Sequence, residues 1–188
     1  NVAVGHESLK VNTAVGNTAV GTISLASNTT GFNNTAVGNC SGNGVTTGDC
    51  NTYIGAFAAY TASTGNNNTA VGDQALSLMT TASDNTAVGR SALKANTTAS
   101  DNTAFGTNSL KSNTTGTNNV AVGKDSLDTN TTASNNTAVG RFSLSANQTG
   151  SGNTAVGSCS LKTSTANDNT AVGHESLRLN AGGSRNSA

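Results

Sequence analysis

The chain has 188 residues, no net formal charge and only 10% charged residues. This balance excludes the basic surface of a nucleic-acid-binding protein, and no apolar run is long enough to insert into a membrane. Hydrophobic residues make up 34% and aromatic residues 3% of the chain, which is low for a domain with one thick core.

The chain opens with the pentad Asn-Val-Ala-Val-Gly, which returns throughout as Asn-Thr-Ala-Val-Gly. From Gly21 to Gly157 the glycine of this pentad recurs every 17 residues, eight times in succession. A Ser or Ala usually follows the glycine after three residues, a Leu after four, and an Asn that often opens Asn-Thr-Thr after seven. Disordered chains have no reason to keep such a register, so the low hydrophobic content does not indicate disorder here.

The pentad occurs twice in succession in the segment Asn12–Gly21, so the register of the first coil has to be decided. Counting from the preceding pentad places Asn12 at the position that opens Asn-Thr-Thr in other repeats. Counting from Gly21 gives the expected Ser, Leu and Asn, whereas counting from Gly16 does not. We therefore predict that the second copy forms a strand and that the first copy fills a corner.

One repeat is too short for a helical hairpin or a propeller blade, which need about 30 residues or more. It suits one coil of a parallel β-solenoid, in which Thr-Ala-Val forms a strand that Gly ends. We expect Ser-Leu and its neighbours to form a second short strand and Asn-Thr-Thr to turn the corner. The predicted fold is all-β, a single parallel β-solenoid over residues 1–188 without caps, as in a segment of a longer fibre. About eleven coils stacked at ~4.8 Å would make a rod roughly 50 Å long.

Alternation along the strand puts Thr and Val on one side, and Asn, Ala and Gly on the other. We expect Val and Leu to meet inside the coil, which leaves Ala on a flat outer face that a second or third chain can approach. The alternative places Ala inside and Val between chains. The Asn side chains either stack their amides along the axis or make turn contacts only. The expected structural ladders are Val20, Val37, Val71, Val88, Val139, Val156, Leu25, Leu76, Leu93, Leu110, Leu127, Leu144, Leu161, Asn34, Asn85 and Asn136.

The segment Cys40–Tyr60 breaks the pattern, because Gly42 and Ala59 stand where other repeats have Leu. Local repacking explains the irregularity. The alternative is an exposed aromatic binding patch, since aromatic side chains dominate recognition surfaces and stack on sugars. The aromatic residues that would form this patch are Tyr53, Phe57 and Tyr60.

Cys40 and Cys50 bracket a loop within the same segment. We predict a disulfide between them, which would indicate an oxidising, extracellular setting and contribute about 3 kcal/mol. The alternative is that these two residues and Cys159 are buried free thiols. Cys159 lies seven coils away from Cys40, about 34 Å, which is too far for a bond within one chain.

Residues that could carry catalysis or bind a metal are scattered. His6 and His174 each precede a Glu, but neither belongs to a His-Glu-x-x-His motif. Asp84, Asp101 and Asp168 precede the pentad Asn, where turn chemistry explains them better than a calcium site. We predict no enzymatic activity and no cofactor. One repeat position carries a partial basic row, for which solvation and contact with an anionic glycan are the two interpretations: Lys10, Lys94, Lys111, Lys162 and Arg178.

The array NTAVGxxSLxxNTTGxxNTAVG resembles the head repeats of trimeric autotransporter adhesins and related repeats in tail-fibre proteins of phages and marine bacteria. The pentad of the adhesins maps onto Asn34–Gly38, Asn85–Gly89 and Asn136–Gly140, and the likeness covers essentially the whole chain. The 17-residue period is longer than the usual coil of these adhesins. The resemblance implies a left-handed parallel β-roll, packing of three chains into a trimer, and attachment to host surface or matrix molecules.

We therefore expect an extracellular structural or adhesive fibre segment, a stiff rod on a cell or virion surface. Its expected partners are further copies of the chain, in a trimer or filament, and a surface glycan or host receptor, with no nucleic acid. Ice binding is a second hypothesis, but it needs outward Thr columns, which our orientation of the strand places inside. A filament subunit with a purely structural role is a further alternative. A polysaccharide-cleaving solenoid enzyme is the least supported, because the acids are scattered.

Overall fold

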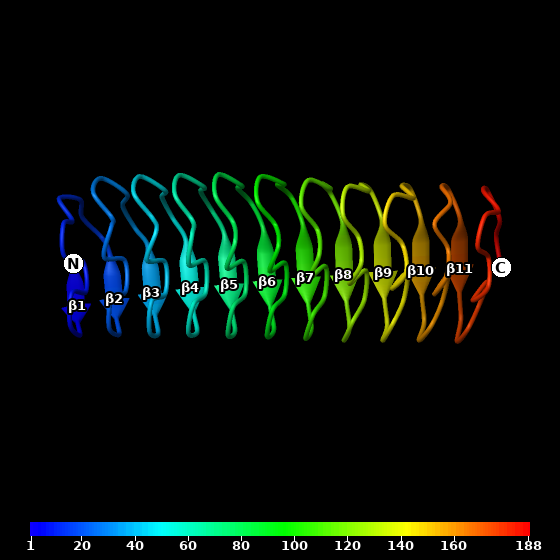
Figure 1. Ribbon diagram of the computed structural model, residues 1–188, viewed down its shortest axis with the longest axis horizontal. Coiled ribbons are helices and arrows are strands. Elements are labelled where there is room, and N and C mark those ends of the chain that lie inside the picture. Colours follow the sequence, from blue (N-terminus) through cyan, green and yellow to red (C-terminus); the bar gives the residue numbers. More distant parts are fainter.

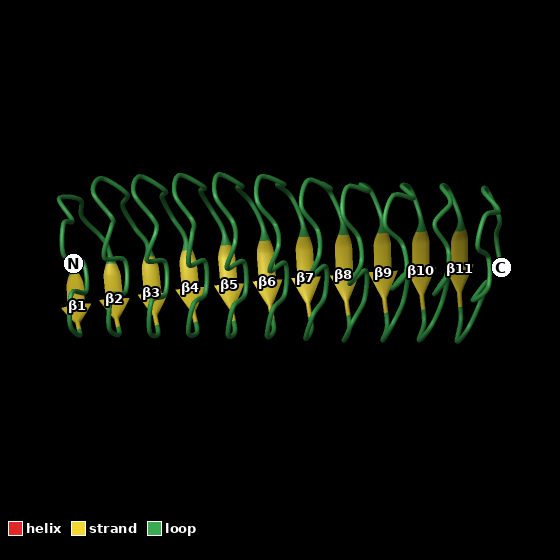
Figure 2. Ribbon diagram, in the orientation of Figure 1, coloured by secondary structure: helices red, strands yellow, loops and turns green.

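The computed structural model describes all 188 residues and confirms the all-β parallel solenoid. Eleven short strands stack in chain order in one sheet, with the two chain ends at opposite ends of the rod (Figure 1). Turns and loops connect the strands (Figure 2), and no helix suited to crossing a membrane is present. The strands are β1 (Val2–Val4), β2 (Thr18–Val20), β3 (Thr35–Val37), β4 (Thr52–Ile54), β5 (Thr69–Val71), β6 (Thr86–Val88), β7 (Thr103–Phe105), β8 (Val120–Val122), β9 (Thr137–Val139), β10 (Thr154–Val156) and β11 (Thr170–Val172).

The strand register resolves the doubled pentad as predicted. β1 pairs with β2 so that Ala3 lies beside Ala19, and the second copy of the pentad carries the strand. Gly16, at the end of the first copy, lies in the corner before β2 at φ 75°. Asn33 holds the same left-handed conformation one coil later, at φ 56°. Asn and Gly are the residues that adopt this conformation most readily, so the first copy is corner material.

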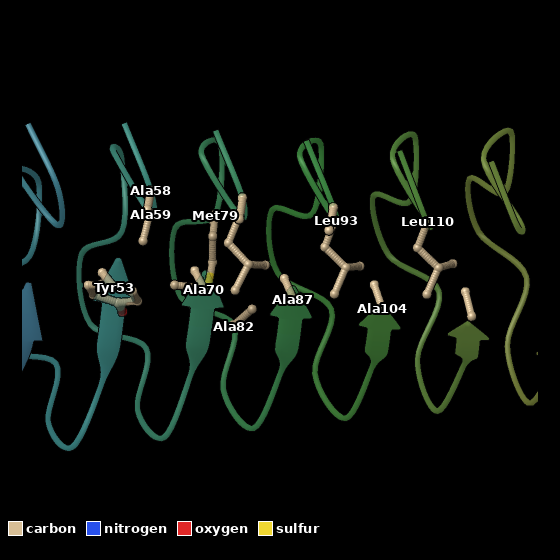
Figure 3. Packing of buried hydrophobic residues seen from close by; sticks show 14 of the residues in the cluster. Tyr53, Ala58, Ala59, Ala70, Met79, Ala82, Ala87, Leu93, Ala104 and Leu110 are labelled. Atoms are coloured by element: carbon tan, nitrogen blue, oxygen red, sulfur yellow. The ribbon is translucent and has the colours of Figure 1, made fainter. Parts of the chain in front are cut away.

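The two faces of the strand are the reverse of our expectation. The central Ala of every strand from β2 to β11 that has one is fully buried, and Leu side chains from the opposite wall, such as Leu93 and Leu110, extend towards this Ala column (Figure 3). The Leu ladder is therefore inside, as predicted, but the Val ladder is not. The physical reason is volume, because a Leu and two Asn side chains already share each coil and leave room for only a methyl group. The Val residues that lie on the outer side are Val20, Val37, Val71, Val88, Val139 and Val156.

The wall that carries Leu is a run of turns, whereas the sequence suggested a second strand. In one regular coil Ser91 has φ 57° and Leu93 has φ 49°, and Asp84 at the preceding corner has φ 59°. A left-handed backbone costs an ordinary residue roughly 1–2 kcal/mol, so burial of the Leu side chain has to offset this cost. The N–H of Leu93 still donates to the carbonyl of Ser109 in the next coil at 3.0 Å. Hydrogen bonds therefore join this wall from coil to coil without strand geometry.

The Asn that opens each pentad points inward, and these residues form a continuous first Asn ladder. From Asn17 to Asn186 the backbone N–H of each member donates to the side-chain Oδ1 one coil earlier, at 2.8 to 3.1 Å. The amide Nδ2 then donates to a corner carbonyl, as Asn85 does to Ala99 at 3.0 Å. The buried side-chain amides thus accept hydrogen bonds from backbone N–H groups in place of backbone carbonyl groups. Stacking along the axis is confirmed for Asn34, Asn85 and Asn136.

A second Asn ladder, at the start of the Asn-Thr-Thr corner, is interrupted. From Asn96 to Asn147 the Nδ2 of each member donates to the Oδ1 of the preceding one, at 2.8 to 3.4 Å. Near the other end of the rod Asn28 donates to Asn12 at 2.8 Å. The Oδ1 of the buried Asn28 has no donor, because the next coils lack the Asn. The residues that interrupt this ladder are Val45, Ala62 and Met79 in three successive coils, and Ser164 nearer the C-terminal end.

Candidate binding surfaces

The irregular coils are rebuilt around Tyr53, which is fully buried and does not belong to a surface patch. Tyr53 stands at the strand position of the inward Ala, and Figure 3 shows its ring inside the coil. A Cβ built on Gly42 would lie 2.9 Å from the Cδ2 atom of this ring. Since Ala59 also lacks a Leu side chain, one ring fills space that two Leu residues occupy elsewhere. The repacking interpretation is confirmed for Tyr53.

The hydroxyl group of Tyr53 is buried without a hydrogen-bond partner. Burial raises the pKa of this phenol far above its ordinary value, and the nearby Asn68 side chain lowers it by less. The phenol is therefore neutral throughout the physiological range. Its position excludes direct contact with a ligand outside the rod.

Phe57 and Tyr60 lie on the surface, with 41% and 39% of their areas exposed. Their ring centroids are 5.7 Å apart in an edge-to-face arrangement. With Leu78 from the following coil, they line an open pocket of about 280 Å³. We call this pocket the aromatic groove. The remaining residues that line it are Gln74, Ser77 and Lys94.

Three successive turns build the aromatic groove. Phe57 and Tyr60 lie in the turn after β4, Gln74 and Leu78 in the turn after β5, and Lys94 in the turn after β6. The Nζ of Lys94 donates to the Oε1 of Gln74 at 2.7 Å and holds two of these turns together. Because the turns repeat at the coil spacing, residues 20 apart in sequence become neighbours. The groove exists only in the stacked rod.

Phe57 and Tyr60 belong to the patch that the repeat predicts, whereas Gln74, Ser77 and Leu78 do not, and Lys94 is predicted only as part of a basic row. Leu78 carries a signal that could have found it. It stands six residues after the pentad glycine, where every other coil between the two end coils has Ala, Gly, Ser or Thr. A large apolar residue at a small, outward position indicates a local surface feature.

The outer side of the sheet is a second candidate surface, the Thr/Val face, formed by the first and third residues of all eleven strands. No charged residue occurs at these positions. Its apolar members are partly exposed, with Ile54 at 39% and Phe105 at 55%. Adjacent strands lie ~4.8 Å apart and the two outward residues of a strand ~6.6 Å apart, so the side chains form a regular grid. The Thr side chains of the strands thus face outward. This finding corrects our prediction that they face into the coil, which argued against ice binding.

The predicted disulfide is absent, since Cys40, Cys50 and Cys159 are free thiols. None of the three is buried, and Cys50 is exposed, so the expectation of buried thiols is wrong as well. Cys40 follows β3, and its N–H donates to Thr22. Cys50 precedes β4, and its N–H donates to Phe32. Cys40 therefore lies after the end of the strand wall and Cys50 before its start, so the five residues of this wall, about 16 Å long, separate their positions in the coil. This separation is beyond the reach of a disulfide. Position within the coil, and not distance in sequence, decides the outcome.

Groups of three or more His, Cys, Asp or Glu side chains that could hold a metal ion are absent from the structure. His6 and His174 are exposed. The three corner acids adopt the left-handed conformation of turn residues, at φ between 58° and 61°, which supports the turn interpretation of Asp84, Asp101 and Asp168. In the basic row Lys10 pairs with Glu7 at 2.8 Å.

Comparisons of this chain with protein-family models, curated proteins and solved structures find no match. The fold and the two surfaces therefore carry the functional argument. Among them, the aromatic groove has a ligand-sized shape, and the Thr/Val face has the length of the rod.

Proposed function

We propose that this chain is a stiff segment of an extracellular structural or adhesive fibre, in which the Thr/Val face packs against further copies of the chain. The observation that supports the proposal most strongly is the extent of this face. It runs uncharged through eleven strands, and its third position is Val, Ile or Phe in every strand. Extended apolar strips on soluble proteins mark interaction surfaces, and parallel sheets rarely leave one side uncovered.

A second copy of the chain has the right geometry to cover this face. Both copies repeat at the coil spacing, so parallel alignment brings each outward Val against the same feature of its neighbour at every level. The absence of charge on the face means that no like charges meet when two or three copies pack. The two internal ladders support a rod that keeps its shape under such packing, because each coil is fixed to the next by backbone and side-chain hydrogen bonds.

The test is the mass of the assembled particle, measured by sedimentation over a wide range of concentrations. We expect a trimer or a filament. Changing Val71 and Val88 together to Lys should release monomers, because buried unpaired charge is costly. The matched control changes Thr81 and Thr98, which are exposed at the corner, to Lys. A wild-type monomer at all concentrations, or equal effects of both charge pairs, would contradict the proposal.

Ice binding is the second candidate, and one observation favours it. Thr69 and Thr86, like Thr at the same position of most other strands, project outward from a flat sheet at regular intervals. Such a grid of hydroxyl and methyl groups can order water. Thermal hysteresis of the wild-type protein, abolished when Thr69 and Thr86 are changed to Lys, would support this candidate. A monomeric particle with clear hysteresis would replace the fibre proposal, and an assembled particle with none would remove ice binding.

A further inference from the structure

The aromatic groove is the one place where two exposed aromatic rings in mutual contact lie beside a cation that makes no ion pair. Phe57, Tyr60 and Leu78 present an apolar floor, and edge-to-face packing of the two rings fixes their orientation. Rings held in this way bind with little loss of conformational entropy, which makes them effective recognition groups. Apart from the two rings, no aromatic pair is in contact anywhere in the rod.

Lys94, like Lys111 and Lys162, differs from the two residues at the ends of the same basic row, which form ion pairs. Lys10 pairs with Glu7 at 2.8 Å, and Arg178 pairs with Glu175 at 3.5 Å, in each case three residues earlier. Lys94 makes no ion pair, and its ammonium group donates to the neutral amide of Gln74. Its charge is therefore not neutralised by a carboxylate within the protein.

The other polar groups of the groove are neutral. Ser77 and Tyr60 contribute hydroxyl groups, and Gln74 contributes an amide. None of the six residues that line the groove is acidic. The nearest carboxylate in sequence is that of the exposed Asp73, whose Oδ2 accepts from the Nε2 of Gln74 at 3.3 Å outside this lining. The charge inside the groove thus favours an anion.

We propose that the aromatic groove binds a saccharide unit that carries a carboxylate. The C–H groups on one side of a pyranose ring carry partial positive charge and stack on the negative faces of aromatic rings. Hydroxyl groups on the ring edge match Gln74 and Ser77, and the sugar carboxylate forms a charge-assisted hydrogen bond with Lys94. This ligand class satisfies the apolar floor, the neutral hydrogen-bonding groups and the unpaired cation together.

The size and openness of the groove agree with one unit of an acidic polysaccharide. A volume of about 280 Å³ lies at the lower end of the range for small-molecule sites and is too small for a folded protein partner. Nucleic acid would need a row of cations, and Lys94 is the only one in the groove. This inference rests on the proposed function only in placing the saccharide on another cell or on its surrounding matrix.

The test is titration calorimetry of the intact chain with a hyaluronan tetrasaccharide, which contains glucuronate, and with the neutral chitotetraose. We expect the acidic probe to bind at least about tenfold more tightly, as one charge-assisted hydrogen bond implies. Lys94→Gln should reduce the affinity for the acidic probe to that for the neutral one. Phe57→Ala together with Tyr60→Ala should abolish binding of both. Circular dichroism of each variant checks that the solenoid remains folded.

Lys162→Gln is the matched control, because Lys162 stands at the same repeat position and lies 5.1 Å from the ring of Phe142. This change removes an equal charge beside a single aromatic residue and should leave binding unchanged. Equal affinity for the two probes, or an equal effect of Lys94→Gln and Lys162→Gln, would overturn the proposal. Equally tight binding of an acidic peptide would overturn it as well, since only charge would then be recognised.

The particle mass, measured on the same samples, separates this proposal from the fibre proposal. A monomer that binds the acidic probe in the groove would leave the saccharide site standing and remove the assembly. An assembled particle that binds neither probe would remove the saccharide site and leave the fibre standing.

Discussion

Two stretches of the same rod solve one packing problem in different ways. The regular region, Asn85–Leu161, fills each coil with one Leu, one small Ala and two Asn side chains. The irregular region, Cys40–Met79, lacks Leu in two successive coils and replaces it with Tyr53 on the facing strand. Strand register and coil spacing are the same in both. The total volume of the interior side chains is therefore conserved over neighbouring coils and not within each single coil.

The two ladders respond differently to the irregular region. Asn51 and Asn68 keep the first Asn ladder intact through it. The second Asn ladder is lost there, and Val45 and Met79 are buried in place of its amides. The first ladder accepts backbone N–H groups, which cannot be removed by substitution, whereas the second pairs mainly with other side chains and corner carbonyls. The first Asn ladder is therefore indispensable, because it accepts hydrogen bonds from the backbone. The second Asn ladder can be replaced, because it pairs mainly with its own side chains.

Tyr53→Ala should give the largest loss of stability, about 3–5 kcal/mol, because it empties space that no Leu side chain of the wild-type chain occupies. Adding Ala59→Leu should recover part of this loss, since Ala59 already has the left-handed backbone of the Leu positions, at φ 48°. Ala59→Leu alone should destabilise by overpacking against the ring. Denaturant unfolding of the two single variants and the double variant measures this coupling. Additive effects would contradict volume sharing between the coils.

Asn85→Ala should cost about 3 kcal/mol, because it leaves the buried N–H of Asn102 without an acceptor and opens a cavity. Asn96→Val, which copies the Val found in the irregular region, should cost less than about 1 kcal/mol. After that change Asn113 still donates to Gly116, and Ala99 still accepts from Asn85. Urea unfolding of both variants tests the contrast. Similar losses would show that the two ladders are equivalent.

Asp128→Asn should raise stability at neutral pH by less than about 1 kcal/mol. Burial, aided by the charge of Asp125, raises the pKa of Asp128 above its ordinary value. The folded chain then holds the proton more tightly than the unfolded chain, so this carboxyl group opposes folding as pH rises through the carboxylate range. The difference between variant and wild type should therefore vanish in acid and grow towards pH 7. A constant difference across this range would be inconsistent with the shift.

Tyr53→Phe should raise stability at neutral pH by about 1–3 kcal/mol, since it removes a buried hydroxyl group that has no partner. This difference should grow in alkali. Burial raises the pKa of Tyr53, so wild-type stability falls once the pH exceeds the ordinary tyrosine value of 10.0, where the unfolded phenol ionises. The variant lacks this fall. Thermal unfolding between neutral pH and alkali measures it, and a clear loss at neutral pH would indicate a hydrogen bond of the hydroxyl group.

The repeat determined much of this structure from sequence alone. The spacing of the pentad located every strand and resolved the doubled pentad, because parallel stacking requires equivalent residues at each level. The same spacing identified the Leu ladder and the Asn column, but it left open whether the amides of Asn85 and its equivalents stack or make turn contacts only. It also identified Phe57 and Tyr60 as residues that break a small, polar pattern.

Tertiary structure alone decided which side of the strand is inside. Alternation tells which residues share a side, but Val20 and Ala19 could each have faced the lumen until the volume of Leu and Asn in the coil was known. The same dependence on neighbouring coils buried Tyr53, kept Cys40 and Cys50 apart, and brought Lys94 to Gln74. Sequence periodicity determines which residues are equivalent along the rod. The space shared between neighbouring coils determines which side chains face inward and which come into contact.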